Sequence, residues 1–264
     1  MSPCSRSRTP QPPPVDVTAR HPPRSDPKSR YLIERHTLMF APSIAVVGEL
    51  HDRAQNRPRS ADGITVVVNP EPMPEPGLTP LRWTEQNIGS ITRHFPPEQT
   101  EVHARSAATR DALLAMQPSR VLYLATHARA HDESVERALA SYVALAPTPG
   151  HDGLLRASDV HRLHLPAEIV ILGACETGGG RATGDGLIGL SRSFLAAGPS
   201  CLVLTITEVL ERSSLEVVHR IHEEWLERGH ALPAAVRRVQ AELAREFPDQ
   251  PHLWCTFLVH GTLM

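Results

Sequence analysis

Two residues that could carry out nucleophilic catalysis each follow an apolar segment typical of a buried strand. His127 comes two residues after the apolar run 121–125, and Cys175 comes three residues after the run 169–172. If these runs are neighbouring parallel strands, their carboxyl ends meet at the sheet edge where catalytic groups of such folds lie. An imidazole beside a thiol lowers the thiol pKa and can later protonate a leaving amine, so the pair would suit acyl transfer.

Both residues also have a purely structural interpretation. A cysteine that ends a buried strand is more often a small core residue, and a histidine at a strand end more often makes only structural hydrogen bonds. The stretch after Cys175 favours chemistry, because its glycines, residues 178–180, let a substrate backbone approach closely and leave N–H groups to bind an oxyanion.

The elements needed to position this pair follow from the hydrophobic pattern. Apolar runs bounded by turn residues predict strands, and apolar residues at helical spacing predict helices. The expected strands cover residues 64–68, 101–103, 121–125, 142–145, 169–172, 201–204 and 253–259. The expected helices cover residues 84–94, 109–116, 158–163, 184–197, 213–228 and 232–245, and residues 43–47 could begin either element. Continuous apolar strands alternating with helices predict an α/β fold with a mostly parallel sheet covered on both faces.

Composition divides the 264 residues into a tail and one domain. Residues 1–30 hold eight of the 25 prolines and six basic against two acidic side chains. We expect them to form a disordered, basic, Pro-rich tail, because they cannot bury enough apolar surface to offset the entropy of ordering. The tail carries about +4, which leaves about −6 for residues 31–264. A net charge of −2 argues against a protein that coats nucleic acid.

The cysteine and hydropathy patterns exclude several classes of protein. The four cysteines form no C-x-x-C pair, which argues against a disulfide framework and a cysteine-rich zinc site. Cys201 and Cys255 lie in apolar runs and are expected in the core. No apolar run approaches the ~18–20 residues of a membrane helix, and the first residues lack a secretory h-region. A soluble, cytoplasmic protein is therefore expected.

Metal and nucleotide sites are not expected. Histidine pairs at helical spacing, such as His219 and His222, could bind zinc, but none lies in an H-E-x-x-H frame. The glycine-rich stretch lacks the lysine of a phosphate-binding loop, and no lysine follows Lys28. We expect no metal and no cofactor.

The sequence around Cys175 resembles the hallmark of one family. Residues 170–178 read Val-Ile-Leu-Gly-Ala-Cys-Glu-Thr-Gly, and residues 184–198 read Gly-Asp-Gly-Leu-Ile-Gly-Leu-Ser-Arg-Ser-Phe-Leu-Ala-Ala-Gly. This pattern resembles the "VLSACETG…GEGLxGLxRxFLxAGA" motif of CHAT domains, caspase-like domains often found beside tetratricopeptide repeats. Other segments of the family are similar to residues 31–35, 41–43, 66–70 and 121–127, and to residues 251–257 with Gly261, so the resemblance covers residues 31–264.

The resemblance implies a fold, an activity and a catalytic pair. The fold is a caspase-hemoglobinase-like three-layer α/β/α sandwich, and the activity is that of a cysteine endopeptidase of the caspase and separase clan. By position in the motifs, His127 is the general base and acid, and Cys175 is the nucleophile. The backbone N–H groups of Ala128 and Cys175 would form the oxyanion hole.

The chain departs from the family pattern at two places. Ala128 stands where the family usually has glycine, and its Cβ disfavours positive φ, so the oxyanion hole would be misaligned if that conformation were required. In the segment 205–211, Thr207 replaces a tryptophan and Glu211 an aspartate. This segment borders the substrate cleft in the family, so the alternative to a peptidase is a catalytically inert scaffold in a signalling assembly.

Several acidic residues are candidates for the substrate cleft, and they suggest a basic side chain in the first specificity pocket. These candidates are Asp132, Glu176, Asp185, Glu208 and Glu211. Asp185 could instead be an acid that stabilises a helix N-terminus. The resemblance implies that the chain cleaves a partner protein in bacterial defence or regulated cell death. We expect an activating or sensor protein in trans, and neither nucleic acid nor membrane as a direct partner.

Overall fold

A six-stranded sheet forms the centre of the molecule. The computed structural model describes residues 31–56, 62–131, 134–173, 184–206 and 210–262, and the sheet order is β2-β1-β3-β7-β8-β9. All neighbours pair in parallel except β8 and β9, which are antiparallel. The mostly parallel sheet predicted from the apolar runs is therefore confirmed. The strands are β1 (Ile64–Val68), β2 (Thr100–Ala104), β3 (Ser119–Ala125), β7 (Ala167–Leu172), β8 (Cys201–Thr205) and β9 (Phe257–Gly261).

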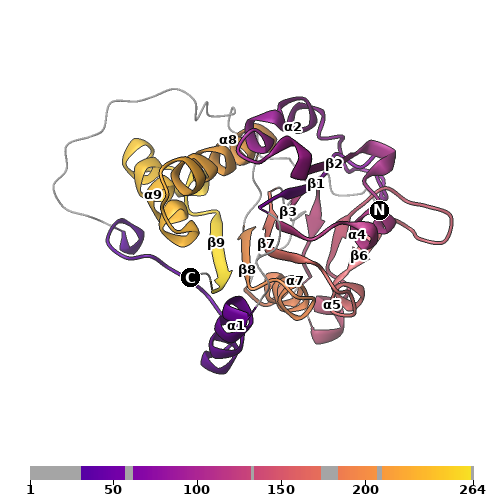
Figure 1. Ribbon diagram of the computed structural model, residues 1–264, viewed down its shortest axis with the longest axis horizontal. Coiled ribbons are helices and arrows are strands. Elements are labelled where there is room, and N and C mark those ends of the chain that lie inside the picture. Colours follow the sequence, from indigo (N-terminus) through magenta and orange to yellow (C-terminus); the bar gives the residue numbers. More distant parts are fainter. Residues whose placement is uncertain (1–30, 57–61, 132–133, 174–183, 207–209, 263–264) are drawn as a thin grey trace, which may run out of the picture.

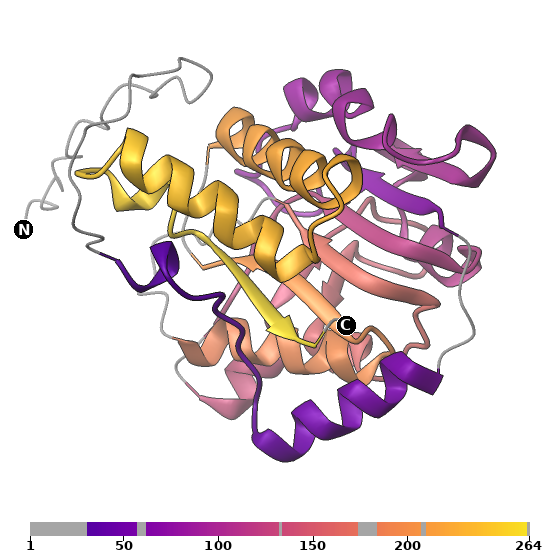
Figure 2. The same cartoon turned by 60° about the vertical axis from the view of Figure 1, so that its left-hand side comes forward.

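The central strands are apolar on both faces because helices cover both faces (Figure 1). Tyr123 of β3 packs in the core under α8 and α9, whereas its neighbours Leu122 and Leu124 pack in the core under α7. One layer contains α2 (Arg82–Asn87), α3 (Gly89–Thr92), α8 (Glu211–His222) and α9 (Leu232–Glu246). The other contains α1 (Ile44–Asn56), α4 (Arg110–Ala115), α6 (Ala157–Val160) and α7 (Gly184–Ala196). Figure 2 shows yellow α9 and orange α8 on the side of the sheet away from indigo α1, which confirms the three-layer sandwich.

A second, smaller sheet continues directly from β3. Its strands are β4 (Ala128–Arg129), β5 (Tyr142–Ala144) and β6 (Leu154–Arg156), and both pairings are antiparallel. The short helix α5 (Val135–Leu139) lies in the connection between β4 and β5 and packs against α7. Only Thr126 and His127 separate β3 from β4, so His127 lies at the junction of the two sheets.

The edge strand β9 is partly covered along its outer side. The Phe40 N–H donates to the Val259 carbonyl at 2.8 Å, and the Gly261 N–H donates to the Phe40 carbonyl at 2.8 Å. Nearer the start of β9, the Gln240 side chain of α9 donates to the Phe257 carbonyl at 2.7 Å. The segment that precedes α1 and one side chain therefore occupy the place of a further strand.

Some element boundaries differ from those predicted. The helices expected at 84–94 and 213–228 are each interrupted, the second because α8 continues as a π-helix, η4 (Glu223–Glu227). The strand expected at 253–259 begins only at Phe257, because a short 3-10 helix precedes it. The 3-10 helices are η1 (Leu32–Glu34), η2 (Pro97–Gln99), η3 (Arg105–Ala107) and η5 (Pro251–Leu253).

A fully buried histidine lies where α8 meets the π-helix. His222 packs against the rings of His94, Phe95 and Trp225, with ring centroids 5.8 to 6.0 Å away. One ring nitrogen, Nδ1, donates to the Val218 carbonyl at 2.8 Å. Burial lowers the pKa of His222 to about 4, because the charged ring would lose its hydration. The folded protein therefore holds this side chain neutral.

The free energy of unfolding should fall as the pH drops from 6.5 toward 4. In this range His222 takes up a proton in the unfolded chain but not in the folded protein, so acid favours unfolding. The full loss is about 3 kcal/mol, from a pKa difference of roughly two and a half units. Urea unfolding of the wild type and His222→Leu over this range measures it, and the variant should lose that part of the slope. His36→Leu, at an exposed position, should leave the slope unchanged, and an unchanged slope in His222→Leu contradicts the prediction.

Candidate catalytic site

His127 is buried at the carboxyl end of β3, and its ring is held by a backbone group. The side chain is 4% exposed, and Nε2 lies 2.7 Å from the Thr79 carbonyl oxygen. A carbonyl only accepts hydrogen bonds, so Nε2 must carry the proton. In the neutral ring this leaves Nδ1 as the nitrogen that can take up a proton, which is what a general base requires.

The loop between β1 and α2 supplies the Thr79 carbonyl and is anchored beside His127. Glu75 of this loop accepts a hydrogen bond from the Tyr142 hydroxyl of β5, and lies 3.5 Å from the guanidinium of Arg129 in β4. Burial, and then the nearby Glu75, raise the pKa of Tyr142, so its hydroxyl stays a donor. From the sequence, no role is predicted for this loop, residues 69–81. Its place directly after β1, the neighbour of β3, is the signal that could have linked it to the site.

The pairing of β3 with β7 aligns the chain segments that lead to the two predicted catalytic residues. Leu124 lies opposite Leu172 in the parallel ladder, and the Gly173 N–H donates to the Leu124 carbonyl at 3.1 Å. His127 follows Leu124 by three residues, and Cys175 follows Leu172 by three residues. Cys175 and Glu176 lie outside the described residues, so the prediction of a His–Cys pair stays a prediction.

Gly173 is required by close packing rather than by its backbone conformation. A Cβ atom at this position would overlap the ring and the hydroxyl of Tyr123. Tyr123 is 1% exposed and packs in the core under α8 and α9, so its ring has little room to move. The chain therefore leaves β7 in close contact with a buried aromatic ring of β3.

Ala128 fits its position without strain. It lies in β4 opposite Val143 and is buried. The described non-glycine residues with positive φ are Asn69 and Arg105, so Ala128 has a backbone conformation open to any residue. The Ala144 N–H donates to the His127 carbonyl, and polar groups alternate along a strand, so the Ala128 N–H points away from β5. The Cβ of Ala128 thus requires no distortion of this N–H.

The acidic cleft candidates are placed differently from one another. Glu211, in the first turn of α8, accepts a hydrogen bond from the Thr84 N–H of α2 at 2.7 Å, so its carboxylate ties α8 to α2. Asp185 lies in the first turn of α7. Asp132 and Glu208 lie outside the described residues. For these four the role in substrate binding stays a prediction.

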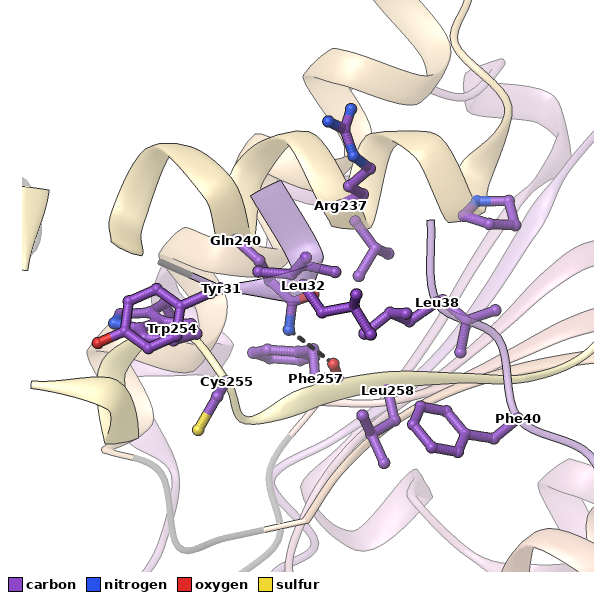
Figure 3. Close-up of a pocket in the computed structure, with 14 residues that line it drawn as sticks. Tyr31, Leu32, Leu38, Phe40, Arg237, Gln240, Trp254, Cys255, Phe257 and Leu258 are labelled. Atoms are coloured by element: carbon purple, nitrogen blue, oxygen red, sulfur yellow. Dashed lines mark hydrogen bonds between the residues drawn. The ribbon is translucent and has the colours of Figure 1, made fainter. Parts of the chain in front are cut away.

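The other described thiols and the cavity lie apart from His127. Cys201 is fully buried, as predicted, while Cys255 is half-buried, and burial raises the pKa of both thiols. A cavity of about 220 Å³ lies between η1, α9 and β9, with Tyr31, Trp254 and Phe257 in its wall (Figure 3). In the sheet order, β7 and β8 separate β9 from β3. Within the described ranges, no helix is long and apolar enough to cross a membrane.

Gly173→Ala should destabilise the fold by about 1–3 kcal/mol, because the buried Tyr123 ring must move to admit the new methyl group. Thermal or urea unfolding measures the change. Gly48→Ala is the matched control, because an added Cβ there meets nothing within 4 Å on helix α1. It should be neutral or stabilising by up to about 1 kcal/mol, as for other exposed helical glycines. Equal stability of the two variants would show that the Tyr123 contact is not constraining.

Comparisons with known proteins agree on the family and the fold. Residues 16–262 match the model of the CHAT domain family. Tetratricopeptide repeat protein 28 of Homo sapiens, and that of Mus musculus, are 32% identical over 117 residues, 43% of this chain but only 5% of either relative.

Two solved structures are similar to most of the chain. The Saccharomyces cerevisiae separase–securin complex gives a TM-score of 0.52 at 14% identity, over 86% of this chain and 14% of that one. The Arg-specific cysteine proteinase gingipain R gives 0.50 at 10% identity, over 81% and 51%. The chain thus spans only a part of each of these relatives. It has the caspase-like α/β/α fold and belongs to the CHAT domain family.

Proposed function

We propose that the chain is a cysteine endopeptidase in which Cys175 is the nucleophile and His127 the general base and acid. The observation that carries this proposal is the register of β3 and β7. Leu124 pairs with Leu172, and the two reactive residues follow these partners at the same distance along the chain. The tautomer imposed on His127 by the Thr79 carbonyl further supports it, since Nδ1 is then able to accept a proton.

The reaction proceeds through a thioester. The Cys175 thiol gives its proton to His127, and the sulfur attacks the carbonyl carbon of the scissile peptide. The tetrahedral intermediate collapses when the C–N bond breaks and the amine leaves with the proton from His127. A water molecule then gives a proton to His127 and attacks the thioester carbon. The C–S bond breaks, the acid product leaves, and His127 returns the proton to the Cys175 sulfur.

Backbone N–H groups of Ala128 and Cys175 stabilise the negative oxygen of both tetrahedral intermediates in this proposal. The direction of the Ala128 N–H, away from β5, supports its part. A donor held by a sheet needs no reorganisation when the charge develops, and such donors are worth about a hundredfold or more in rate.

The substrate in this proposal is a partner protein, cleaved in the cytoplasm during bacterial defence or regulated cell death after activation by a separate sensor protein. The charge of about −6 on residues 31–264 favours a basic side chain in the first specificity pocket. Cleavage rates of peptides with arginine and with aspartate before the scissile bond test this preference, because a basic preference predicts faster cleavage after arginine.

Activity should require both members of the pair. The measurements are labelling by a peptidyl fluoromethyl ketone and cleavage of co-expressed products of neighbouring genes. Cys175→Ala should abolish both, and His127→Ala should reduce both by about 10²–10⁴-fold, because the thiol loses its base. Cys255→Ala removes a half-buried thiol outside the pair and should behave as the wild type. If all three variants behave as the wild type does, the enzyme proposal is wrong, and the alternative of a catalytically inert scaffold is favoured.

Ala128→Gly tests whether the departure from the family glycine impairs the oxyanion hole. Because Ala128 has an unstrained conformation, kcat/KM should change by less than about threefold. Unfolding should show a loss of about 0.5–1 kcal/mol, the usual effect of glycine inside a strand. A rise in kcat/KM of about tenfold or more would mean that the Ala128 side chain obstructs the hole.

A further inference from the structure

Asn69 lies where β1 enters the loop that carries the Thr79 carbonyl. Its side chain is fully buried, and its φ of 47° is one that asparagine adopts more readily than most residues. The Asn69 N–H donates to the Ala125 carbonyl at 3.3 Å, and Oδ1 accepts from the Leu81 N–H at 2.7 Å. Ala125 precedes His127 by two residues, and Leu81 follows Thr79 by two. One residue therefore joins both segments whose contact orients the His127 ring.

A charged pair determines which way the Asn69 amide faces. Nδ2 donates to Glu85 Oε2 at 2.5 Å, and Glu85 Oε1 accepts from Arg105 Nε at 2.7 Å. These hydrogen bonds form a closed cycle, because the Arg105 N–H donates to the Asn69 carbonyl at 3.1 Å. A carboxylate can only accept hydrogen bonds, so Glu85 turns the Asn69 amino group toward itself. The amide oxygen then faces the Leu81 N–H, as the loop requires.

The three residues of this hydrogen-bonded cycle lie in three different parts of the fold. Asn69 follows β1, Glu85 lies on α2, and Arg105 follows β2. The cycle therefore joins the loop after β1 to helix α2 and to the end of β2. The Glu85 carboxylate is 18% exposed and the Arg105 side chain 59% exposed. Solvent screens a pair of this kind, so its effect lies in orienting the amide more than in overall stability.

We infer that Asn69, oriented by Glu85 and Arg105, is a positioning residue that keeps the Thr79 carbonyl against Nε2 of His127. Asn69 acts through the loop, without a hydrogen bond to His127 itself. The catalytic meaning of this inference rests on the proposed function, whereas its effect on the His127 tautomer does not.

The first experiment reads the tautomer in protein without the nucleophile. Cys175→Ala protein labelled with ¹⁵N-histidine is studied by nuclear magnetic resonance, well above the usual pH range of imidazole titration. The parent should show His127 with the proton on Nε2. Adding Asn69→Asp places two acceptors side by side at Glu85, so the loop should shift and the ring should show mixed tautomers. N69D/E85Q exchanges donor and acceptor between the two positions and should restore the parent signal.

Gln86→Ala is the matched control in the same background. Gln86 is exposed on α2 next to Glu85, so the variant should retain the parent tautomer although it changes the same helix. Asn69→Gly keeps the positive φ and removes the amide, so it should show mixed tautomers as Asn69→Asp does. It serves as the second variant if Asn69→Asp does not fold.

The second experiment measures peptide cleavage with Cys175 present. Asn69→Asp should lower kcat by about 10–100-fold and change KM by less than about threefold, as expected when a supporting hydrogen bond is lost. N69D/E85Q should recover kcat to within about threefold, while Gln86→Ala should match the wild type. A merely structural role would change stability without this recovery or this separation of kcat from KM.

The outcomes separate the inference from the proposed function. If folded Asn69→Asp and Asn69→Gly proteins keep the parent tautomer, or if N69D/E85Q fails to restore it, the inference is overturned whatever the activity. If the wild type shows no cleavage that depends on Cys175, the proposed function fails, and the tautomer still decides the role of Asn69.

Discussion

The parallel pairing of β3 with β7 is the constraint on which the rest of the site depends. Both strands are apolar on both faces, and successive side chains enter separate cores. A shift of one residue would turn Leu122 and Leu124 toward the wrong core, so the register is fixed by burial on two sides at once. The ends of the two strands, and the chain that leaves them, are aligned by the same burial. A hydrophobic pattern thus determines where polar groups of the site can lie.

Rigid strands place the backbone of His127, but they do not set the orientation of its ring. A loop carbonyl does this, and a carbonyl is only as well placed as the loop that bears it. The loop between β1 and α2 is therefore held at its middle by Glu75 and at its ends by Asn69. Glu211 anchors α2, the element that follows, by accepting from Thr84. Charged side chains near the site are used largely to hold backbone segments in place.

The layers of the fold could be predicted from sequence because each central strand is an uninterrupted apolar run of nearly the right length. The small sheet could be predicted only in part, since strands of two or three residues, such as Ala128–Arg129, are too short to show a period. The antiparallel direction of β9 could not be predicted, because it depends on how α8 and α9 connect β8 to β9 and no local sequence pattern indicates that path.

The site shows the same division between local and distant information. Strand ends and the motif predict His127 and Cys175, whereas the contact of His127 with Thr79 joins residues 48 positions apart. The motif predicts a cleft acid at Glu211. Its partner, the N–H of Thr84, lies on a helix distant in sequence, and backbone N–H groups carry no signature of residue type.

The covering of β9 has a consequence for how the molecule behaves at high concentration. An uncovered edge strand offers a row of backbone groups on which another chain can build, and this is a common start of aggregation. On the outer side of β9, the carbonyls of Phe257 and Val259 and the N–H of Gly261 are already occupied by Gln240 and Phe40. Another molecule could extend the sheet here only after displacing Gln240 and Phe40, so the fold protects this edge against edge-to-edge aggregation.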